Sequence, residues 1–306
     1  MVINKKNAYK MFITACILLP ILFQYAGIAT VTIGDLFLMI SFAVLCFFNS
    51  NIIIKKEILF LIIYILLLSM LLILQDRFET DALWTTLRYI VYLICIAVMP
   101  NVLSESKFAI TFYKKICMLV SYFFLLQYAL LKVFDYCLPG VLQFFKLTDE
   151  SLYDYRYAIY YTNSRRCMSV FGEPSHYAIY VLPFLILILF KKSKIEKKEM
   201  ADVLVVSLTI LLSSSFTGIL GMLFIWGIWG VNLIKKINVP RKIVWVILLG
   251  IGAITIVLLL SDVVNYIFNI EIYSRHASER FVGFSYVFEE KSSLFEKLFG
   301  HVMKDV

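Results

Sequence analysis

The sequence predicts an all-α integral membrane protein that crosses the bilayer many times. Hydrophobic residues make up 61% of its 306 residues and charged residues only 16%, against about 25% charged in a typical soluble domain. The mean hydropathy is +0.87. Apolar runs of the length that a helix needs to cross a bilayer recur along the chain. The runs do not alternate as the strands of a membrane barrel do, and backbone in hydrocarbon must satisfy its own hydrogen bonds, which favours helices.

Nine spans are expected in a single membrane domain, residues 1–306, with a cytoplasmic N-terminus. The predicted spans are 9–28, 32–49, 57–74, 83–102, 108–133, 174–190, 201–214, 217–234 and 243–261. The first run lacks a small-residue cleavage site and is followed by further spans, so it is interpreted as a retained helix and not as a signal peptide. Two large outer loops, 134–173 and 262–306, complete this topology.

Basic residues in short loops predict the orientation. They lie at Lys5, Lys6, Lys10, Lys55, Lys56, Lys107, Lys114, Lys115, in "KKSKIEKK" (191–198) and in "KKINVPRK" (235–242). All of these segments fall on one side if the N-terminus is cytoplasmic, as the excess of Lys and Arg in cytoplasmic loops requires. The net charge of +8 is therefore explained by topology, and nucleic acid is not expected as a partner.

The run 201–234 is predicted to cross the membrane twice. Both flanking lysine-rich segments favour the cytoplasmic side, so the chain must go out and return between them. "SSSFTG" (213–218) is the natural turning point. Each limb is short for a full crossing, which is tolerated where other helices cover it. One long tilted helix is the alternative.

Six cysteines do not form a disulfide framework. Cys16, Cys46, Cys95 and Cys117 lie in apolar runs and are interpreted as small core residues. Cys137 and Cys167 share the first large outer loop, where a disulfide between them is an alternative to two free thiols.

Charges on the outer face are not explained by the positive-inside rule. The outer loops carry the arginines Arg156, Arg165, Arg166, Arg275 and Arg280. Arginine presents a planar fork that binds phosphate through two hydrogen bonds, so arginines converging from separate loops would suit a lipid diphosphate. The alternative is that they pair with nearby acidic residues such as Asp154 and Glu279.

The sixth span begins at a polar cluster, "RRCMSVFGEPSHYAIY" (165–180). Pro174 suits the first turn of a helix, and Glu173 favours the positive end of the helix dipole. His176 follows within one turn, and a histidine can accept a proton near neutral pH. These residues are explained either as a helix start or as part of a site. The tyrosine-rich stretch 149–163 similarly suits either the membrane interface or sugar stacking.

The order of motifs resembles the Wzy-type polymerases of O-antigen and capsular polysaccharide. The pattern R-x-x-S-x-F-x-E-P-S-H (166–176) at the end of a long outer loop carries the resemblance. "LLQYALLKVFDYCLPG" (125–140), "LLSSSFTGILGML" (211–223), "SERFVGF" (278–284) and "LFEKLFGHV" (294–302) look like the segments around that motif. From about residue 120 onward most of the chain is covered, whereas the N-terminal third matches only as hydrophobic spans.

The resemblance implies a metal-independent membrane glycosyltransferase without a cofactor. It would join undecaprenyl-diphosphate-linked oligosaccharide repeat units on the outer face of the bacterial inner membrane, in lipopolysaccharide or capsule synthesis. Its partners would be this lipid-linked substrate, membrane lipids and a chain-length regulator protein. Family members continue with further helices after the Leu-Phe-Gly segment, whereas this sequence ends at Val306, so a truncated, inactive product and a short variant are both expected alternatives.

The resemblance also implies roles for individual residues. Arg166 and Arg280 would stabilise the charge that develops on the diphosphate leaving group, supported by Arg156, Arg165 and Arg275. Glu173 would accept the proton of the acceptor hydroxyl, with His176 and His276 as the reserve bases. Ser169, Ser214 and Thr217 would bind sugar or phosphate.

Three other functions remain open from the sequence. An O-antigen ligase shares the architecture, although the Glu-Pro form of the motif favours the polymerase. A flippase or other transporter of lipid-linked oligosaccharide should keep ionisable groups deep in the membrane, whereas Asp35, Arg88 and Lys132 all lie near the ends of spans. A non-catalytic membrane partner would tolerate the loss of Arg166 and Glu173.

Overall fold

The computed structural model describes residues 4–28, 31–49, 59–67, 80–142, 144–148 and 166–235. The described chain is mostly helical, as expected for an all-α protein. Two of its helices, α5 (Ser106–Phe134) and α9 (Phe216–Lys235), are long and apolar enough to cross a membrane. The ninth predicted span, 243–261, lies outside the described residues. Of the third predicted span, 57–74, the structure describes residues 59–67, which are helical.

The first helix, α1 (Lys5–Leu22), begins at an N-cap and ends soon after a proline. The Asn4 side chain accepts a 2.9 Å hydrogen bond from the backbone N–H of Asn7, which satisfies one of the unpaired donors at the helix start. Pro20 supplies no backbone N–H, and the helix ends at Leu22, short of the predicted boundary at residue 28.

A small antiparallel hairpin connects α1 to α2. Its strands are β1 (Ala26–Ile28) and β2 (Val31–Thr32), which the sequence did not predict. The second helix, α2 (Ile33–Phe48), starts at a capping box: the Thr32 hydroxyl accepts from the N–H of Asp35, and the Asp35 carboxylate accepts from the N–H of Thr32, both at 3.1 Å. Reciprocal bonds of this kind fix the first turn of a helix.

Helix α4 (Thr80–Val98) passes into a 3₁₀ segment, η1 (Met99–Glu105), before α5 begins. Pro100 lies at this change, and a proline both removes a donor and disfavours α-helical backbone in the residue before it. The next helix, α5, ends at Asp135, which adopts a left-handed conformation with φ of 51°. Left-handed residues commonly end helices in this way.

Three helices follow the long loop: α7 (Pro174–Leu189), α8 (Lys197–Leu212) and α9. The break between α8 and α9 falls at residues 213–215, within the predicted turn, so the structure has two helices here and not one long helix. A Cβ atom on Gly218 would lie 2.4 Å from the Ala178 Cβ, and one on Gly221 would lie 2.7 Å from a Leu182 methyl group. The later residue in α9, Gly221, contacts the later residue in α7, Leu182. Helices α7 and α9 therefore run parallel, with both N-termini at one end.

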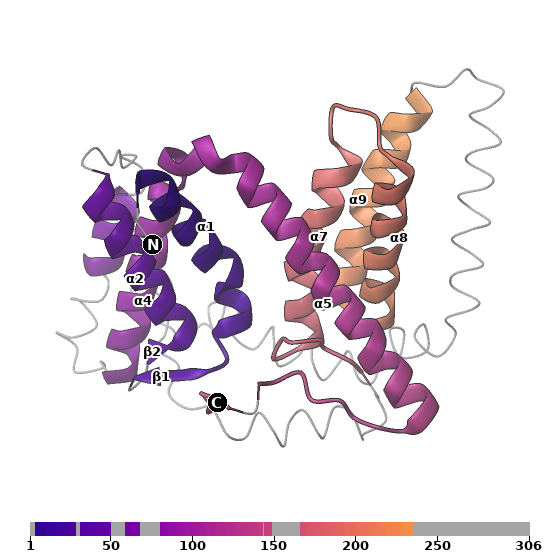
Figure 1. Ribbon diagram of the computed structural model, residues 1–306, viewed down its shortest axis with the longest axis horizontal. Helices are drawn as coiled ribbons and strands as arrows, with labels where there is room; N and C mark the ends of the chain where they lie inside the picture. The colour runs from indigo at the N-terminus through magenta and orange to yellow at the C-terminus, as the bar shows by residue number, and fades with distance from the viewer. Residues whose placement is uncertain are drawn as a thin grey trace, which may run out of the picture.

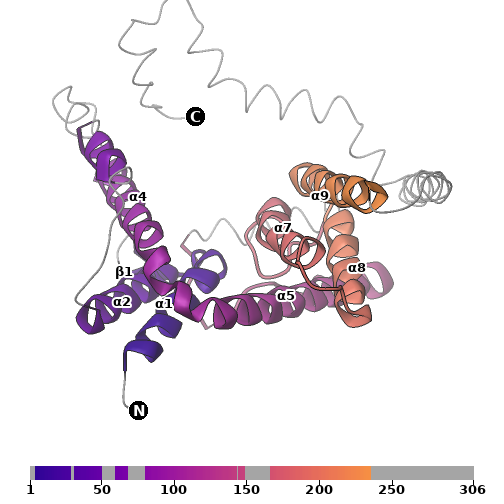
Figure 2. The ribbon, with the colours of Figure 1, turned by 90° about the horizontal axis from the view of Figure 1, so that it is seen from above.

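The helices form two groups joined by α5. Helices α1, α2 and α4 pack together on one side and α7, α8 and α9 on the other, while α5 crosses from the first group to the second (Figures 1 and 2). Each group has its own apolar core: Phe12, Leu38 and Leu45 are buried in the first, and Phe124 and Val181 in the second.

Large apolar side chains cover much of the outside of these helices. Only 33% of the apolar window of α5 and 22% of that of α9 are buried inside the protein. Leu119 is 66% exposed and Phe224 is 70% exposed. A core helix of a soluble protein would bury its apolar face, and large exposed apolar patches mark contact with another apolar phase. The surface therefore favours a membrane setting for these helices.

Candidate functional site

Four segments far apart in the sequence meet at one end of the structure, which we call the Arg166 end. Their described residues are 23–28 with 31–32, 135–142 with 144–148, 166–173 and 213–215. The Gln24 side chain donates a 2.8 Å hydrogen bond to the carbonyl of Val170. The N–H of Ala26 donates to the carbonyl of Lys146, and that of Thr148 to the carbonyl of Gln24. In Figure 1 this end is at the bottom, where β1 and β2 lie.

Arg166 connects the polar cluster before α7 to the turn between α8 and α9. Its Nε donates to the carbonyl of Ser213 at 3.2 Å, and its Nη2 donates to the carbonyl of Ser214 at 2.9 Å. The last carbonyls of a helix lack partners within the helix, and a cation near a helix C-terminus is also favoured by the helix dipole. Arg166 therefore links the polar cluster before α7 to the serine-rich turn between α8 and α9.

Left-handed backbone occurs at two of the residues that the sequence predicted for the site. Ser169 has φ of 56° and Ser214 has φ of 52°. A non-glycine residue in this region costs of order 1–3 kcal/mol and persists only where its surroundings hold it. At Ser214 the surroundings include the bond from Arg166 to its carbonyl. Conformations of this kind cluster at functional sites, which makes the turn a candidate for one.

Ser169 is buried and acts as a structural link. Its side chain is fully buried, and its hydroxyl donates a 2.7 Å hydrogen bond to the carbonyl of Val120 in α5. The Gln127 side chain donates to the carbonyls of Ser169 and Leu138, at 3.1 and 3.0 Å. A Cβ atom on Gly140 would lie 1.8 Å from the Ser169 carbonyl oxygen. Ser169 therefore positions the segment before α7, and its predicted contact with sugar or phosphate remains untested.

Glu173, His176 and Thr217 lie at the N-termini of α7 and α9. Glu173 is half-buried, and its Oε2 accepts a 2.9 Å hydrogen bond from the hydroxyl of Ser175. His176 and Thr217 are exposed. In α9 the first turn is capped by the Ser215 hydroxyl, which accepts from the N–H of Gly218. Two parallel helix N-termini and the Arg166 guanidinium thus contribute positive potential to this end, beside the Glu173 carboxylate and the C-terminus of α8, which contribute negative potential.

Five of the predicted site residues lie outside the described part of the chain: Arg156, Arg165, Arg275, His276 and Arg280. The tyrosine-rich stretch 149–163 and the second outer loop, 262–306, also lie outside it. Among the predicted site residues within the described part, a hydrogen bond joins Arg166 to Ser214. Glu173 and His176 share the start of α7, and Thr217 follows the turn.

Cys137 and Cys167 are free thiols in the structure, so the alternative of a disulfide between them is not observed. Both are buried. Burial raises the pKa of Cys137 to about 11 and that of Cys167 to about 12, because a thiolate is disfavoured away from water. Both thiols are therefore protonated and unreactive at neutral pH.

A buried ion pair links α2 to α4 in the first group of helices. Asp35 is 4% exposed, and its Oδ2 lies 3.1 Å from Nε of Arg88. The Tyr92 hydroxyl donates to Oδ1 at 2.5 Å, and the Thr32 hydroxyl donates to Oδ2 at 2.9 Å. The guanidinium also lies over the Phe23 ring, 5.2 Å from its centroid. A buried charge is tolerated only when it is paired in this way.

The opposite end of the structure, which we call the lysine end, carries a second charged cluster. Glu199 near the start of α8 lies 3.6 Å from Nζ of Lys114 in α5 and accepts a hydrogen bond from Lys191 after α7. The hydrogen bond from Lys191 is the main reason that the pKa of Glu199 is lowered. Lys10 lies over the Phe108 ring at this end, 5.3 Å from its centroid. These lysines belong to the segments predicted to be cytoplasmic.

Two glutamines that connect the Arg166 end were not singled out by the sequence. Gln24 and Gln127 are 7% and 0% exposed, and Oε1 of Gln127 has no hydrogen-bond partner among the described residues. In both cases the sequence signal is a glutamine within an apolar run, because a buried amide side chain needs hydrogen-bond partners. Their partners are backbone carbonyls, which the sequence alone does not identify.

Across the described residues, no three His, Cys, Asp or Glu side chains come together as a metal site would require, and metal-independent chemistry stays a prediction. Comparisons with protein-family models, with curated proteins and with solved structures found no match to this chain.

Proposed function

We propose that this chain is a Wzy-type polymerase, a multi-pass protein of the bacterial inner membrane with about nine spans. In this proposal it joins undecaprenyl-diphosphate-linked oligosaccharide repeat units into O-antigen or capsular polysaccharide, and the Arg166 end faces outward. The proposal rests on the motif order in the sequence. One structural observation supports it: Arg166 binds the carbonyls of Ser213 and Ser214, which joins two motifs that lie 47 and 48 residues apart.

The charges at the Arg166 end suit the leaving group of this reaction. Breaking the bond between sugar and phosphate leaves negative charge on the diphosphate. Arg166 and the N-termini of α7 and α9 supply positive potential there, and preorganised charge of this kind lowers the barrier most where water is excluded. Arg156, Arg165, Arg275 and Arg280, from the two outer loops, are proposed to add further charge.

Glu173 is the proposed general base. It is half-buried at the first turn of α7, close in sequence to the arginine that would hold the diphosphate. Its bond from Ser175 orients the carboxylate, and an oriented carboxylate within reach of the acceptor hydroxyl can take its proton. His176 is the second choice, because its ring is exposed at the same helix start.

Reconstitution of the purified chain tests the proposal directly. The chain is placed in lipid with an undecaprenyl-diphosphate-linked repeat unit, and the products are separated on a gel. A ladder spaced by one repeat unit is the expected result. Arg166→Ala and Glu173→Gln should each lower chain extension by about 100-fold or more, the usual loss when a charge-stabilising group or a general base is removed.

The control for these variants is Lys132→Ala. Lys132 lies in the last turn of α5 and contacts the Tyr128 ring, so the variant removes a cation near the Arg166 end without touching the α8–α9 turn. It should retain the ladder. Wild-type extension by Arg166→Ala, at an unchanged amount of protein in the membrane, would refute the role of Arg166.

Transport of lipid-linked oligosaccharide is a second candidate, favoured by the buried pair of Asp35 and Arg88. Ionisable groups buried between membrane helices often belong to transport pathways, and this pair is buried between α2 and α4 even though both residues lie near the ends of their predicted spans. Asp35→Asn separates the two functions. A transporter should lose movement of the lipid-linked sugar across vesicle membranes, whereas a polymerase should keep its product ladder when substrate is supplied on the outer side.

A further inference from the structure

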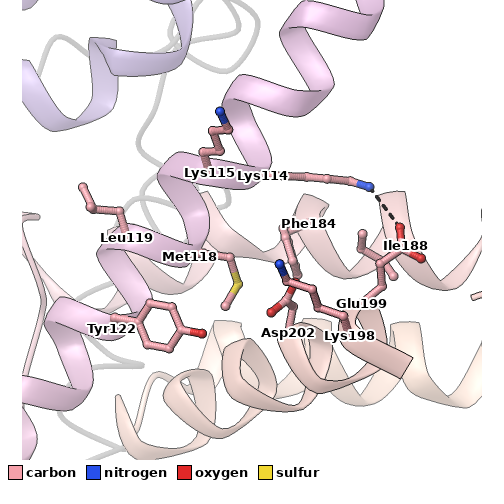
Figure 3. A pocket seen from close by; sticks show the side chains of 10 residues that line it. All are labelled: Lys114, Lys115, Met118, Leu119, Tyr122, Phe184, Ile188, Lys198, Glu199 and Asp202. Carbon is pink, nitrogen blue, oxygen red and sulfur yellow. Dashed lines mark ion pairs between the residues drawn. The ribbon is translucent and has the colours of Figure 1, made fainter. Parts of the chain in front are cut away.

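A groove opens at the lysine end between α5, α7 and α8, away from the Arg166 end. Its volume is about 550 Å³. The groove is lined by Lys114, Lys115, Met118, Leu119, Tyr122, Phe184, Ile188, Lys198, Glu199 and Asp202. Figure 3 shows Lys114 reaching toward Glu199, Lys198 and Asp202 lying beside Met118, and Lys115 pointing away from them higher on α5, with Leu119 and Tyr122 following along that helix.

The charged part of the groove is basic on balance. Lys114 and Lys191 both contact Glu199, so two lysines share one carboxylate. Lys115 and Lys198 are exposed at the groove, and Asp202 is the second carboxylate there. Lys114, Lys115 and Lys198 line the groove, and Lys191 lies beside it through its contact with Glu199. These four lysines stand against two carboxylates, and the surplus of positive charge suits a ligand with an anionic head.

The other part of the groove is apolar and continues onto the surface of a candidate membrane helix. Leu119 is 66% exposed and Tyr122 is 55% exposed, and both lie in α5, one of the two helices long and apolar enough to cross a membrane. Phe184 and Ile188 of α7 line the floor of the groove, where each is only 1% exposed, so most of its accessible apolar surface belongs to α5. A soluble nucleotide or sugar phosphate has no apolar part to cover this surface, whereas an acyl chain has.

We infer that this groove binds an anionic glycerophospholipid of the adjoining leaflet. The phosphate lies between Lys115 and Lys198, and one acyl chain lies along Met118, Leu119 and Tyr122. Lysines near a membrane surface are attracted to anionic headgroups, and Met118, Leu119 and Tyr122 follow Lys115 along α5 in the order that an acyl chain extending from such a headgroup would meet them. The inference rests on the membrane placement in the proposed function and is independent of the glycan chemistry.

Photo-crosslinking of the full-length chain tests the site. The purified chain is incorporated into bilayers that contain phosphatidylglycerol or phosphatidylcholine, each with a photoreactive group in the acyl chain, and labelled peptides are mapped by mass spectrometry. Phosphatidylglycerol should label the peptides that contain Met118–Tyr122 and Phe184–Ile188 about fivefold more than phosphatidylcholine does. Equal labelling by the two lipids would overturn the inference, because the groove would then be ordinary lipid-facing surface.

A pair of double variants separates the groove from the general charge of this end. Lys115→Gln with Lys198→Gln should reduce labelling by phosphatidylglycerol about fivefold or more. Lys192→Gln with Lys194→Gln removes the same charge from exposed positions that do not line the groove and should change labelling less than about twofold. Equal losses in the two double variants would contradict the inference. The product ladder of the proposed polymerase is a separate measurement, so a negative result for lipid binding in the groove does not contradict the proposed function.

Discussion

At Ser214 the backbone and the side chain have different roles, one structural and one predicted for substrate binding. The backbone is left-handed, with φ of 52°, and its carbonyl accepts from Arg166. The predicted substrate contact, by contrast, would come from the hydroxyl. A glycine at this position keeps the carbonyl and adopts the same conformation without strain.

Ser214→Gly should therefore leave stability within about 1 kcal/mol of the parent chain, whereas Ser214→Val should lower it by about 1–3 kcal/mol, because a β-branched residue is poorly tolerated at positive φ. The thermal unfolding midpoint in detergent measures both effects. If the hydroxyl binds substrate, Ser214→Gly also lowers chain extension at unchanged stability. Equal midpoints for the two variants would contradict the argument from backbone strain.

The roles of single residues were harder to predict than their location. The sequence indicated that Arg166 and the Ser213–Gly218 turn both belong to the outer face, and the structure joins them through backbone carbonyls. Every residue type has a backbone carbonyl, so a sequence motif does not identify which carbonyl will accept a hydrogen bond from an arginine. Ser169 shows the converse: a serine in a polar cluster suits a ligand contact and a buried link equally well from its sequence. The structure shows the link, through its hydroxyl bond to Val120, and the ligand contact stays a prediction.

Close packing between α7 and α9 depends on a residue without a side chain. A Cβ atom on Gly218 would lie 2.4 Å from the Ala178 Cβ, whereas one on Gly227 in the same helix would meet no atom within 4 Å. The two glycines therefore offer a matched comparison within one element, since both substitutions by alanine raise the helix propensity of α9 equally.

We expect Gly218→Ala to destabilise the protein by about 1–3 kcal/mol, because an overpacked contact forces the helices apart, and Gly227→Ala to be neutral or stabilising by up to about 1 kcal/mol. Thermal unfolding midpoints of the two variants give the comparison. Adding Ala178→Gly to Gly218→Ala should recover part of the loss. Matching midpoints for Gly218→Ala and Gly227→Ala would show that the close approach of α7 and α9 is unimportant.

Helices were predictable from the sequence wherever apolar runs had clear ends. Pro174 marks the start of α7, and the serines at 213–215 mark the break between α8 and α9. The end of α1 was less predictable, because residues 26–32 form a hairpin instead of extending the helix. That hairpin is held in part by Lys146 and Leu147, which lie more than a hundred residues away, and local patterns carry no signal for such contacts.

Polar contacts at the two ends of the molecule follow the division of the sequence into outer and inner segments. Val170 and Lys146 from the first predicted outer loop meet Gln24 and Ala26, near the outer end of the first predicted span, at the Arg166 end. Residues from the predicted cytoplasmic segments meet at the lysine end, through Lys114, Glu199 and Lys191. This agreement concerns which segments lie together, and the direction of the whole across a membrane stays a prediction.

The direction can be measured with one cysteine at each end. Phe144 is 86% exposed at the Arg166 end, and Lys194 is exposed at the lysine end. A membrane-impermeant maleimide applied to spheroplasts should label Phe144→Cys above the background of the parent chain, whereas Lys194→Cys should be labelled only after lysis, as the positive-inside rule requires. The reverse pattern would invert the topology and place the Arg166 end in the cytoplasm.

The bond from Gln24 to Val170 joins residues 146 positions apart, and this has a consequence for the order of assembly. A ribosome makes the chain from its N-terminus, so α1 and α2 are complete long before residue 170 is synthesised. The contact between Gln24 and Val170 can therefore form only after the segment before α7 has been made, whereas α1 and α2 can pack against each other earlier. Closure of the Arg166 end is accordingly expected to be a late step in assembly.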